Sequence, residues 1–142
     1  MKQIKILLFF VLFFITSTNK IKTQNVIITK NCEGTNFPFK NINVVAPDSV
    51  KRGDSIVFQI YGEADSEVEI FKLKIQASIN NNLVYNKTED TPYANLSEGD
   101  GYDYTHTQSV PIFAPTGDYS IRISLVDKNM NEVSCFIGLF SL

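Results

Sequence analysis

Apolar and polar residues alternate with a period of two along most of the chain after residue 24. Segment 69–79 shows this best, because lysine or glutamine separates successive large apolar side chains. This period is typical of strands with one buried face, and no window has the spacing of an amphipathic helix. The side chains expected to point inward are Ile56, Phe58, Ile60, Phe71, Leu73, Ile75, Ala77, Ile79, Tyr119, Ile121, Ile123 and Leu125.

Turn residues divide these segments into seven or eight short strands. Asn80–Asn82 is expected to close a hairpin, because asparagine tolerates left-handed dihedrals. The acidic, glycine-containing segment 89–103 is expected to be a loop. No segment offers room for crossover helices. The pattern therefore predicts an all-β fold, an antiparallel β-sandwich of immunoglobulin-like layout.

The first 24 residues have the layout of a secretory signal peptide. A short basic stretch precedes ten apolar residues, Ile6–Ile15, which are followed by small polar residues. The apolar run is about half the length of a membrane-spanning helix. Cleavage is expected between about residues 18 and 24, leaving a single domain, 25–142, in the secretory pathway or the lysosomal or endosomal lumen.

Removal of this segment makes the chain acidic. A cut after Gln24 leaves 9 of the 13 Lys and Arg residues against 15 Asp and Glu, a net charge of −6. Nucleic-acid binding depends on clustered basic residues, so no nucleic acid is expected as a partner. No metal, cofactor or phosphate-binding motif is present in the sequence. A soluble monomer without a cofactor is expected.

The only two cysteines, Cys32 and Cys135, lie near opposite ends of the mature chain. Thiols oxidise in the secretory pathway, and two cysteines are too few for a structural zinc site. One disulfide that ties the first strand to the last is expected, although two free buried thiols remain an alternative. Closing a loop of about 100 residues stabilises a fold by roughly 4–5 kcal/mol in the chain-entropy model.

No group of residues in the sequence indicates a catalytic centre. His106, the only histidine, lies in a strand-like stretch and is expected at the surface. The carboxylates of segment 89–103 lack the spacing of a calcium loop and are expected to be solvated. Hydrolysis through Asp100 and Asp103 remains a minor alternative. The sequons at Asn86 and Asn95 are expected glycosylation sites, with use of at least one.

Several passages, in order, resemble the ML (lipid-recognition) family. They are "NC" at Asn31–Cys32, "VVAPDSVKRGDSIVFQIYG", and the closing "PIFAPTGDYSIRISLVDKNMNEVSCFIGLFSL". The resemblance covers about residues 25–142. It implies a disulfide between Cys32 and Cys135. The chain lacks the further cysteines with which many family members close the loop that corresponds here to residues 89–101.

The resemblance also implies a function, which is to hold a lipid between the two sheets without catalysis. Ten methylenes buried at about 0.8 kcal/mol each suffice for tight binding before association costs. The expected partners are a phospholipid or sterol and, transiently, membranes. An immunoglobulin-like module that recognises a protein or glycan is the alternative, because the same alternation fills a solid core. The residues expected to line a lipid slot are Phe58, Ile60, Phe71, Leu73, Ile75, Ile121 and Ile123, with Tyr104, Val110, Ile112 and Phe113 nearer its mouth.

Overall fold

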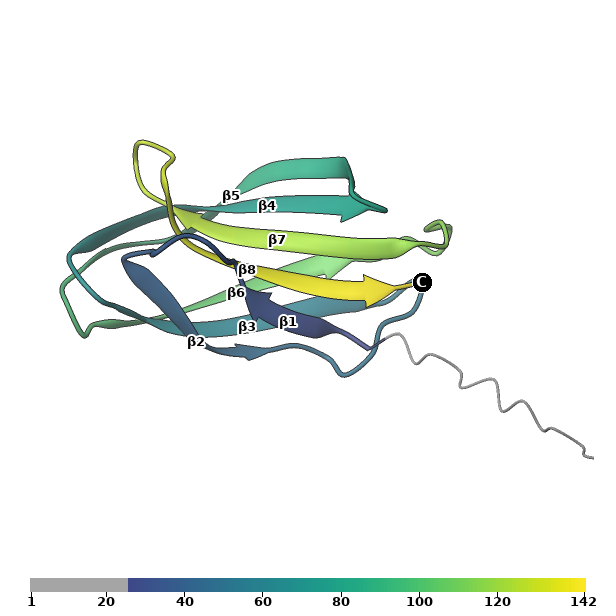
Figure 1. Cartoon of the computed structure of the whole chain (residues 1–142), viewed down its shortest axis with the longest axis horizontal. Coiled ribbons are helices and arrows are strands. Elements are labelled where there is room, and N and C mark those ends of the chain that lie inside the picture. Colours follow the sequence, from purple (N-terminus) through teal and green to yellow (C-terminus); the bar gives the residue numbers. More distant parts are fainter. Residues whose placement is uncertain (1–25) are drawn as a thin grey trace, which may run out of the picture.

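The computed structural model describes residues 26–142, which form eight antiparallel strands in two facing sheets (Figure 1). The predicted signal segment lies outside these residues. The five-stranded sheet has the order β1-β8-β7-β4-β5, and the three-stranded sheet has the order β2-β3-β6. The predicted antiparallel β-sandwich is confirmed. The strands are β1 (Ile28–Asn31), β2 (Phe39–Val45), β3 (Ser55–Ala64), β4 (Val68–Ile79), β5 (Asn82–Leu96), β6 (Gly101–Ser109), β7 (Asp118–Val126) and β8 (Glu132–Ser141).

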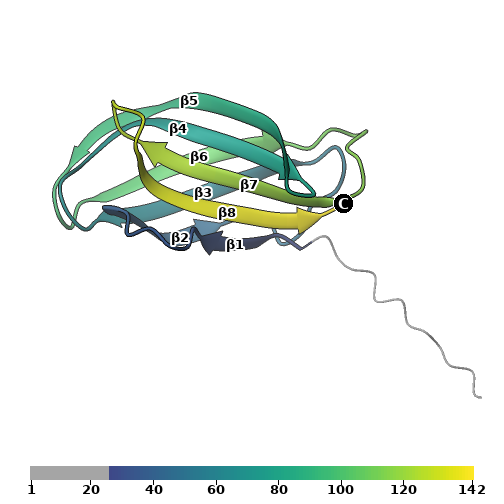
Figure 2. The ribbon, with the colours of Figure 1, turned by 45° about the horizontal axis from the view of Figure 1, so that its top comes forward.

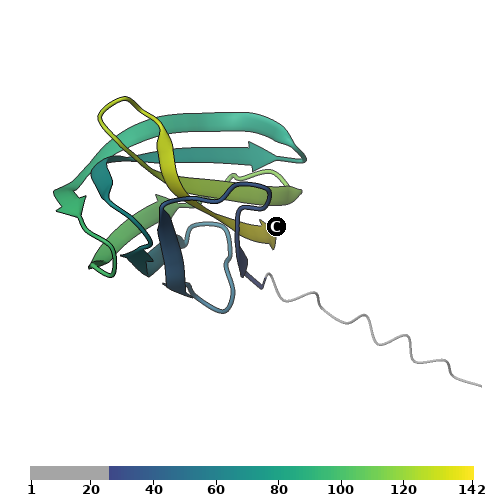
Figure 3. The same cartoon turned by 60° about the vertical axis from the view of Figure 1, so that its left-hand side comes forward.

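Figure 2 shows β5, β4, β7 and β8 side by side in one layer, with β3 and β6 behind them. Figure 3 shows the two layers from another side. The edge strands correspond across the sandwich. Asn31, at the end of β1, donates a hydrogen bond to the carbonyl of Asn41 in β2, and His106 in β6 contacts Glu89 in β5. The sandwich therefore has a β1/β2 edge and a β5/β6 edge.

The hairpin predicted at the asparagine run joins β4 to β5. Asn80 and Asn81 have φ angles of 47° and 67°, in the left-handed region that asparagine tolerates. The Asn80 side chain also accepts a hydrogen bond of 2.9 Å from the backbone N–H of Asp118. This contact holds the hairpin beside the start of β7.

The prediction of an acidic loop over 89–103 is wrong. Most of that segment lies in β5 and β6, and only residues 97–100 connect the two strands. The connection is a tight turn, in which the Asp100 carboxylate accepts a 2.8 Å hydrogen bond from the Ser97 N–H. The charged residues and Pro92 are unusual for a strand, so the sequence pattern did not predict this part of β5. Both features are compatible with an edge strand, which has one open hydrogen-bonding side.

An irregularity in the pairing of β4 with β5 changes one inward position. The pairing of β4 with β5 shifts register between Ile70 and Lys72. Consequently Ile70 is fully buried, while Phe71 is only half-buried and lies near the Lys72 ammonium, 5.4 Å from its ring centre. Simple alternation placed Phe71 inward, which is wrong, because this irregularity interrupts the alternation of side-chain faces along β4.

The predicted disulfide is present. Cys32, immediately after β1, is bonded to Cys135 in β8, and their Cα atoms are 5.5 Å apart. The backbone N–H of Cys32 also donates to the carbonyl of Cys135. The covalent link therefore attaches the β1 end of the chain to the last strand, beside the β1/β2 edge.

Candidate functional site

The inner faces of the two sheets form one continuous apolar interior. At its centre the rings of Phe58 in β3 and Phe136 in β8 meet edge to face, with centroids 5.6 Å apart. Gly138 permits this approach, because a Cβ there would lie 3.0 Å from the Phe58 ring. The other buried aliphatic side chains of β3, β4 and β7 in this core are Ile56, Ile60, Ala64, Val68, Ile70, Leu73, Ile75, Ile121, Ile123 and Leu125.

A polar cluster interrupts this interior near the β1/β2 edge. The Oδ1 atom of Asn41 accepts hydrogen bonds from the Tyr104 hydroxyl (2.8 Å) and the Ser134 hydroxyl (3.1 Å). All three residues are buried, and they come from β2, β6 and β8. Burial raises the pKa of Tyr104 above that of a free tyrosine, so its hydroxyl remains a donor. The cluster links the two sheets through hydrogen bonds.

His106 connects the sheets at the opposite edge. The prediction that it lies at the surface is wrong, since only 3% of the residue is exposed. It shares the inward face of β6 with Tyr104. Its Nδ1 lies 3.2 Å from the Glu89 carboxylate in β5, and Lys87 lies 3.3 Å from the same carboxylate.

A second contact joins β6 to β5 at this edge. The Tyr102 hydroxyl bonds to the Thr91 hydroxyl at 2.9 Å and to the Pro92 carbonyl at 2.6 Å. Among residues 26–142 no backbone ladder pairs β5 with β6. The β5/β6 edge is therefore joined by side chains.

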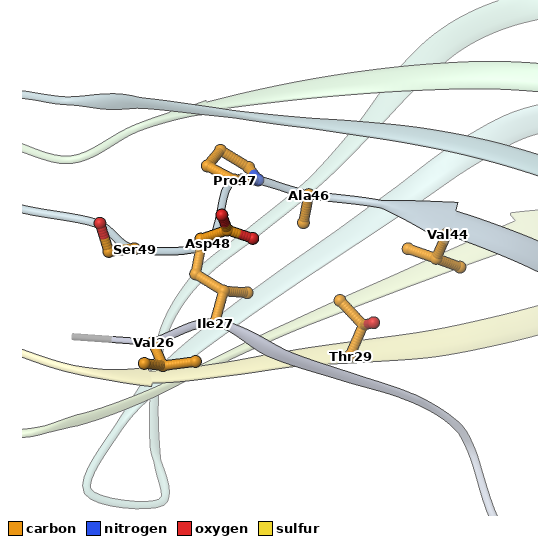
Figure 4. Close-up of a pocket in the computed structure, with 8 residues that line it drawn as sticks. All are labelled: Val26, Ile27, Thr29, Val44, Ala46, Pro47, Asp48 and Ser49. Atoms are coloured by element: carbon orange, nitrogen blue, oxygen red, sulfur yellow. The ribbon is translucent and has the colours of Figure 1, made fainter. Parts of the chain in front are cut away.

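An open groove of about 520 Å³ lies between the start of the described chain and the segment after β2. In Figure 4 the side chains of Ile27 and Thr29 lie opposite those of Val44 and Ala46. Three of these, Ile27, Val44 and Ala46, also pack against the main core. The groove is thus a surface hollow whose apolar wall continues into the sandwich interior.

The structure brings most of the predicted lipid-lining residues together. Phe58, Ile60, Leu73, Ile75, Ile121 and Ile123 are buried on the facing inner surfaces. Tyr104 joins the polar cluster, and Val110 is buried just after β6. These side chains pack against one another, so their role in lining a lipid slot remains a prediction.

Three predicted residues lie elsewhere. Phe71 is only half-buried, beside the irregular pairing of β4 with β5. Ile112 and Phe113 lie on the loop between β6 and β7 and are among the most exposed apolar side chains of the described chain. They lie at the end of the sandwich that holds the C-terminus, at the right of Figure 1.

Sequence reasoning missed several interior residues. Phe136 alternates with Cys135 in the last strand, so the period of two was a usable clue. Asn41, Ser134 and His106 carried no such clue, because a polar residue in a strand is normally assigned to the solvent face. Their burial depends on partners from distant parts of the chain, such as Asn41 with Ser134.

Carboxylates do not assemble into a metal site. Within residues 26–142 no three His, Cys, Asp or Glu side chains converge in a way that could hold a metal ion. The Asp100 carboxylate is hydrogen-bonded within the turn at residues 97–100, and Asp103 lies on an exposed position of β6.

The sequon residues Asn86 and Asn95 are both exposed on the edge strand β5. Between residues 26 and 142 there is no helix with the length and hydropathy of a membrane span.

The fold and its apolar interior define the class of the protein: residues 26–142 form a β-sandwich domain with facing apolar sheets. The sequence profile of the ML domain matches residues 26–141. The chain therefore belongs to the ML domain family, and the predicted resemblance is confirmed. Among curated proteins, no sequence is similar enough to this chain to count as a relative.

Solved structures agree with this assignment at the level of fold. A Niemann-Pick type C2 protein from Japanese carpenter ant is 11% identical, with a TM-score of 0.55, over 80% of this chain and 98% of the other. Chicken MD-1, solved in complex with lipid IVa, is 18% identical, with a TM-score of 0.52, over 84% of this chain and 92% of the other. The C-terminal domain of wzt has a similar fold, with a TM-score of 0.51, 14% identity, and coverage of 82% and 75%. Membership of the ML domain family supports lipid binding.

Proposed function

We propose that this protein is a lipid carrier that holds one phospholipid or sterol between its two sheets and works in the extracellular space or the endolysosomal lumen. The observation that carries the proposal is the pair of apolar inner faces in an ML domain, whose β5/β6 edge has no backbone ladder among residues 26–142. The predicted signal peptide supports the location. The protein acts by binding, shielding and release, without catalysis.

Binding requires the inner faces to separate. Phe58 and Phe136 touch across the interior, so a ligand has to displace this contact. We expect separation to cost least at the β5/β6 edge, because Glu89 is partly exposed there, whereas the polar cluster near the β1/β2 edge is buried. An acyl chain or sterol then replaces contacts between apolar side chains, and each buried methylene contributes about 0.8 kcal/mol.

Glycosylation of β5 is compatible with this function. Asn86 and Asn95 are exposed on a long edge strand. Exposed strand edges can pair with other chains, and bulky glycans oppose such pairing. We therefore propose that at least one of the two asparagines is glycosylated and that the glycan keeps the carrier monomeric.

The test of the proposed function is mass spectrometry of protein secreted from a eukaryotic host, before and after organic extraction. A mass excess that disappears on extraction and is recovered as a defined lipid is the expected result. Phe58→Leu enlarges the space between the sheets and is expected to change the retained lipids. Val57→Ala, on the outward face of the same strand, is the matched control and should retain the wild-type lipids.

The competing function is recognition of a protein or glycan by a solid sandwich. The close packing of Phe58 against Phe136 favours it. Protein at its glycan-corrected mass, with no lipid even after incubation with mixed liposomes, would support this alternative and overturn the proposed carrier.

A further inference from the structure

The side-chain amide of Asn41 in β2 has a hydrogen-bond donor without a partner among residues 26–142. Its Oδ1 atom accepts hydrogen bonds from the Tyr104 and Ser134 hydroxyls, whereas its Nδ2 atom donates to no residue of the described chain. Only 8% of Asn41 is exposed. Buried donors in proteins are nearly always paired. The unpaired Nδ2 therefore indicates a partner that these residues do not supply.

Two hollows give an outside molecule access to this donor, and Asn41 lines both of them. The first, of about 290 Å³, lies between the chain after β1 and strand β2, and Cys32 and Cys135 form part of its wall. The second, of about 310 Å³, lies between β1 and β2. Nδ2 is unpaired and is not one of the fully enclosed unpaired atoms among residues 26–142, so solvent reaches it. A ligand atom can reach it in the same way.

The polar cluster holds the donor in a fixed orientation. Two hydroxyl donors on Oδ1 fix the plane of the amide and leave both N–H groups of Nδ2 for other acceptors. Tyr104 belongs to the same sheet as Asn41, whereas Ser134 belongs to the other sheet. The bond from Tyr104 therefore remains when the sheets separate. The amide stays oriented while a ligand enters.

The charges around the donor favour an uncharged ligand atom. The three residues of the polar cluster are uncharged, and burial raises the pKa of Tyr104, so its hydroxyl remains protonated. The two basic residues that line the hollows are not buried: Lys40 is paired with Asp65 at 2.6 Å, and Lys30 is exposed. An anionic oxygen at Nδ2 would lose water without gaining a buried cation, which is costly.

Apolar side chains flank the donor along β2. Phe39 is buried in the core and also lines the first hollow. Val44 packs against the core and lines the second hollow. An oxygen that reaches Asn41 therefore has apolar surface on both sides. The hydroxyl of a sterol and the ester carbonyl of an acyl lipid both combine an uncharged oxygen with attached hydrocarbon.

We propose that Asn41 is the polar anchor of the lipid site and that its Nδ2 donates a hydrogen bond to an uncharged lipid oxygen, a hydroxyl or an ester carbonyl. The inference rests on the proposed carrier function and names the chemistry of the ligand that the same site selects. The oxygen lies at the β1/β2 edge, and the hydrocarbon attached to it extends into the apolar interior.

Displacement of a fluorescent lipid from the secreted protein measures which oxygen is bound. Two pairs of competitors share their hydrocarbon: cholesterol with the same sterol lacking its hydroxyl, and methyl oleate with ionised oleate. In at least one pair, the member with the uncharged oxygen is expected to compete about tenfold better. A preference in the first pair identifies a hydroxyl, and one in the second pair identifies an ester carbonyl. Equal competition within both pairs, or a preference for ionised oleate, overturns the inference.

Asn41→Asp tests the donor itself, because it removes Nδ2 and keeps an oxygen that accepts from the Tyr104 and Ser134 hydroxyls. The variant is expected to bind the preferred lipid at least about tenfold more weakly and to lose the preference within the pair. Asn43→Asp makes the same change at an exposed position of β2 and should behave like the wild type. Wild-type affinity and preference in Asn41→Asp would overturn the inference.

NMR of the wild type tests the anchor even if Asn41→Asp does not fold. The nitrogen-15 signal of the Asn41 side-chain amide is expected to shift strongly with the preferred lipid and weakly with the other member of its pair. An unchanged signal while lipid binds would mean that water occupies the hollows, and it would overturn the inference.

The same samples separate this inference from the proposed function. Lipid that binds equally to the wild type and to Asn41→Asp overturns the anchor and leaves the carrier function intact. No displacement by any of the four competitors, together with no lipid recovered on organic extraction, overturns both.

Discussion

The two edges of the sandwich are held together by different kinds of bond. At the β1/β2 edge the Cys32–Cys135 disulfide fixes the beginning of the chain to β8, and Asn41 bonds to a buried hydroxyl of the opposite sheet. At the β5/β6 edge the contacts are those of His106 with Glu89 and of Tyr102 with Thr91 and Pro92. The first edge has a disulfide within the five-stranded sheet and a buried hydrogen bond between the sheets, whereas the second has the turn at residues 97–100 and partly exposed side-chain contacts.

Because of this difference, we expect the two edges to behave differently when a lipid enters between the sheets. A lipid carrier has to open and close while remaining folded. At the β1/β2 edge the sheets are joined by the buried hydrogen bond from Ser134 to Asn41, and the disulfide fixes the end of β1 to β8 within one sheet. A few side-chain hydrogen bonds, each worth about 1 kcal/mol net, hold the other edge closed yet can be broken at modest cost. We expect the β1/β2 edge to act as the hinge and the β5/β6 edge as the opening.

Removal of the disulfide should have the largest effect on the free energy of unfolding. Replacing Cys32 and Cys135 together by Ser should lower the free energy of unfolding by about 4–5 kcal/mol, because the loop closed by the bond spans about 100 residues. Urea denaturation of the variant and of the wild type measures this. A loss below about 1 kcal/mol would show that hydrogen bonds and packing alone hold the end of β1 to β8.

Removal of Asn41, the acceptor that Tyr104 and Ser134 share in the polar cluster, is expected to have the second-largest effect on the free energy of unfolding. Asn41→Leu leaves the Tyr104 and Ser134 hydroxyls buried without their partner. We expect a loss of about 2–4 kcal/mol, since each unsatisfied buried group costs about 1–3 kcal/mol. Asn43→Leu, at an exposed position of the same strand, is the control in the same urea experiment. Equal stability of both variants would mean that the cluster does not join the sheets.

Alkaline pH tests the same cluster without disrupting its packing. Burial raises the pKa of Tyr104, so the folded protein resists its ionisation. The resulting stability is present below the unfolded pKa of about 10 and is lost as pH rises towards the folded pKa, by up to about 1.4 kcal/mol per pH unit.

The control for this pH effect is Tyr104→Phe, which should lose less stability than the wild type between about pH 8 and about pH 11. Tyr61 and Tyr102 also have raised pKa values. They are present in both proteins, so the difference between the two profiles isolates Tyr104. Parallel profiles would contradict the expected role of its burial.

The smallest effect on stability is expected at the β5/β6 edge. Glu89→Gln weakens the contact with His106 and should cost less than about 1 kcal/mol, because Glu89 is partly exposed. The same substitution is expected to accelerate exchange of bound lipid, measured with a fluorescent lipid and acceptor vesicles. Asp90→Asn, at the exposed neighbouring acid, is the control. Unchanged exchange in Glu89→Gln would place the opening elsewhere.

The period-two pattern was sufficient to predict the architecture. It identified strands, the Asn80–Asn81 turn and most inward residues, because a half-buried strand has to alternate whatever its neighbours are. Two cysteines in a chain with a predicted signal peptide predicted the disulfide. Local sequence therefore determined the fold class, the covalent link and the apolar inner faces.

Tertiary structure decided the features that depend on partners. The register shift at which Ile70 is buried in place of Phe71 occurs in the pairing with β5, and the strands within 89–103 exist because β4 and β3 pair with them. The burial of His106 and Asn41 is possible because distant residues satisfy their polar atoms. A polar side chain is stable in the interior only with such a partner, and a local pattern carries no information about it.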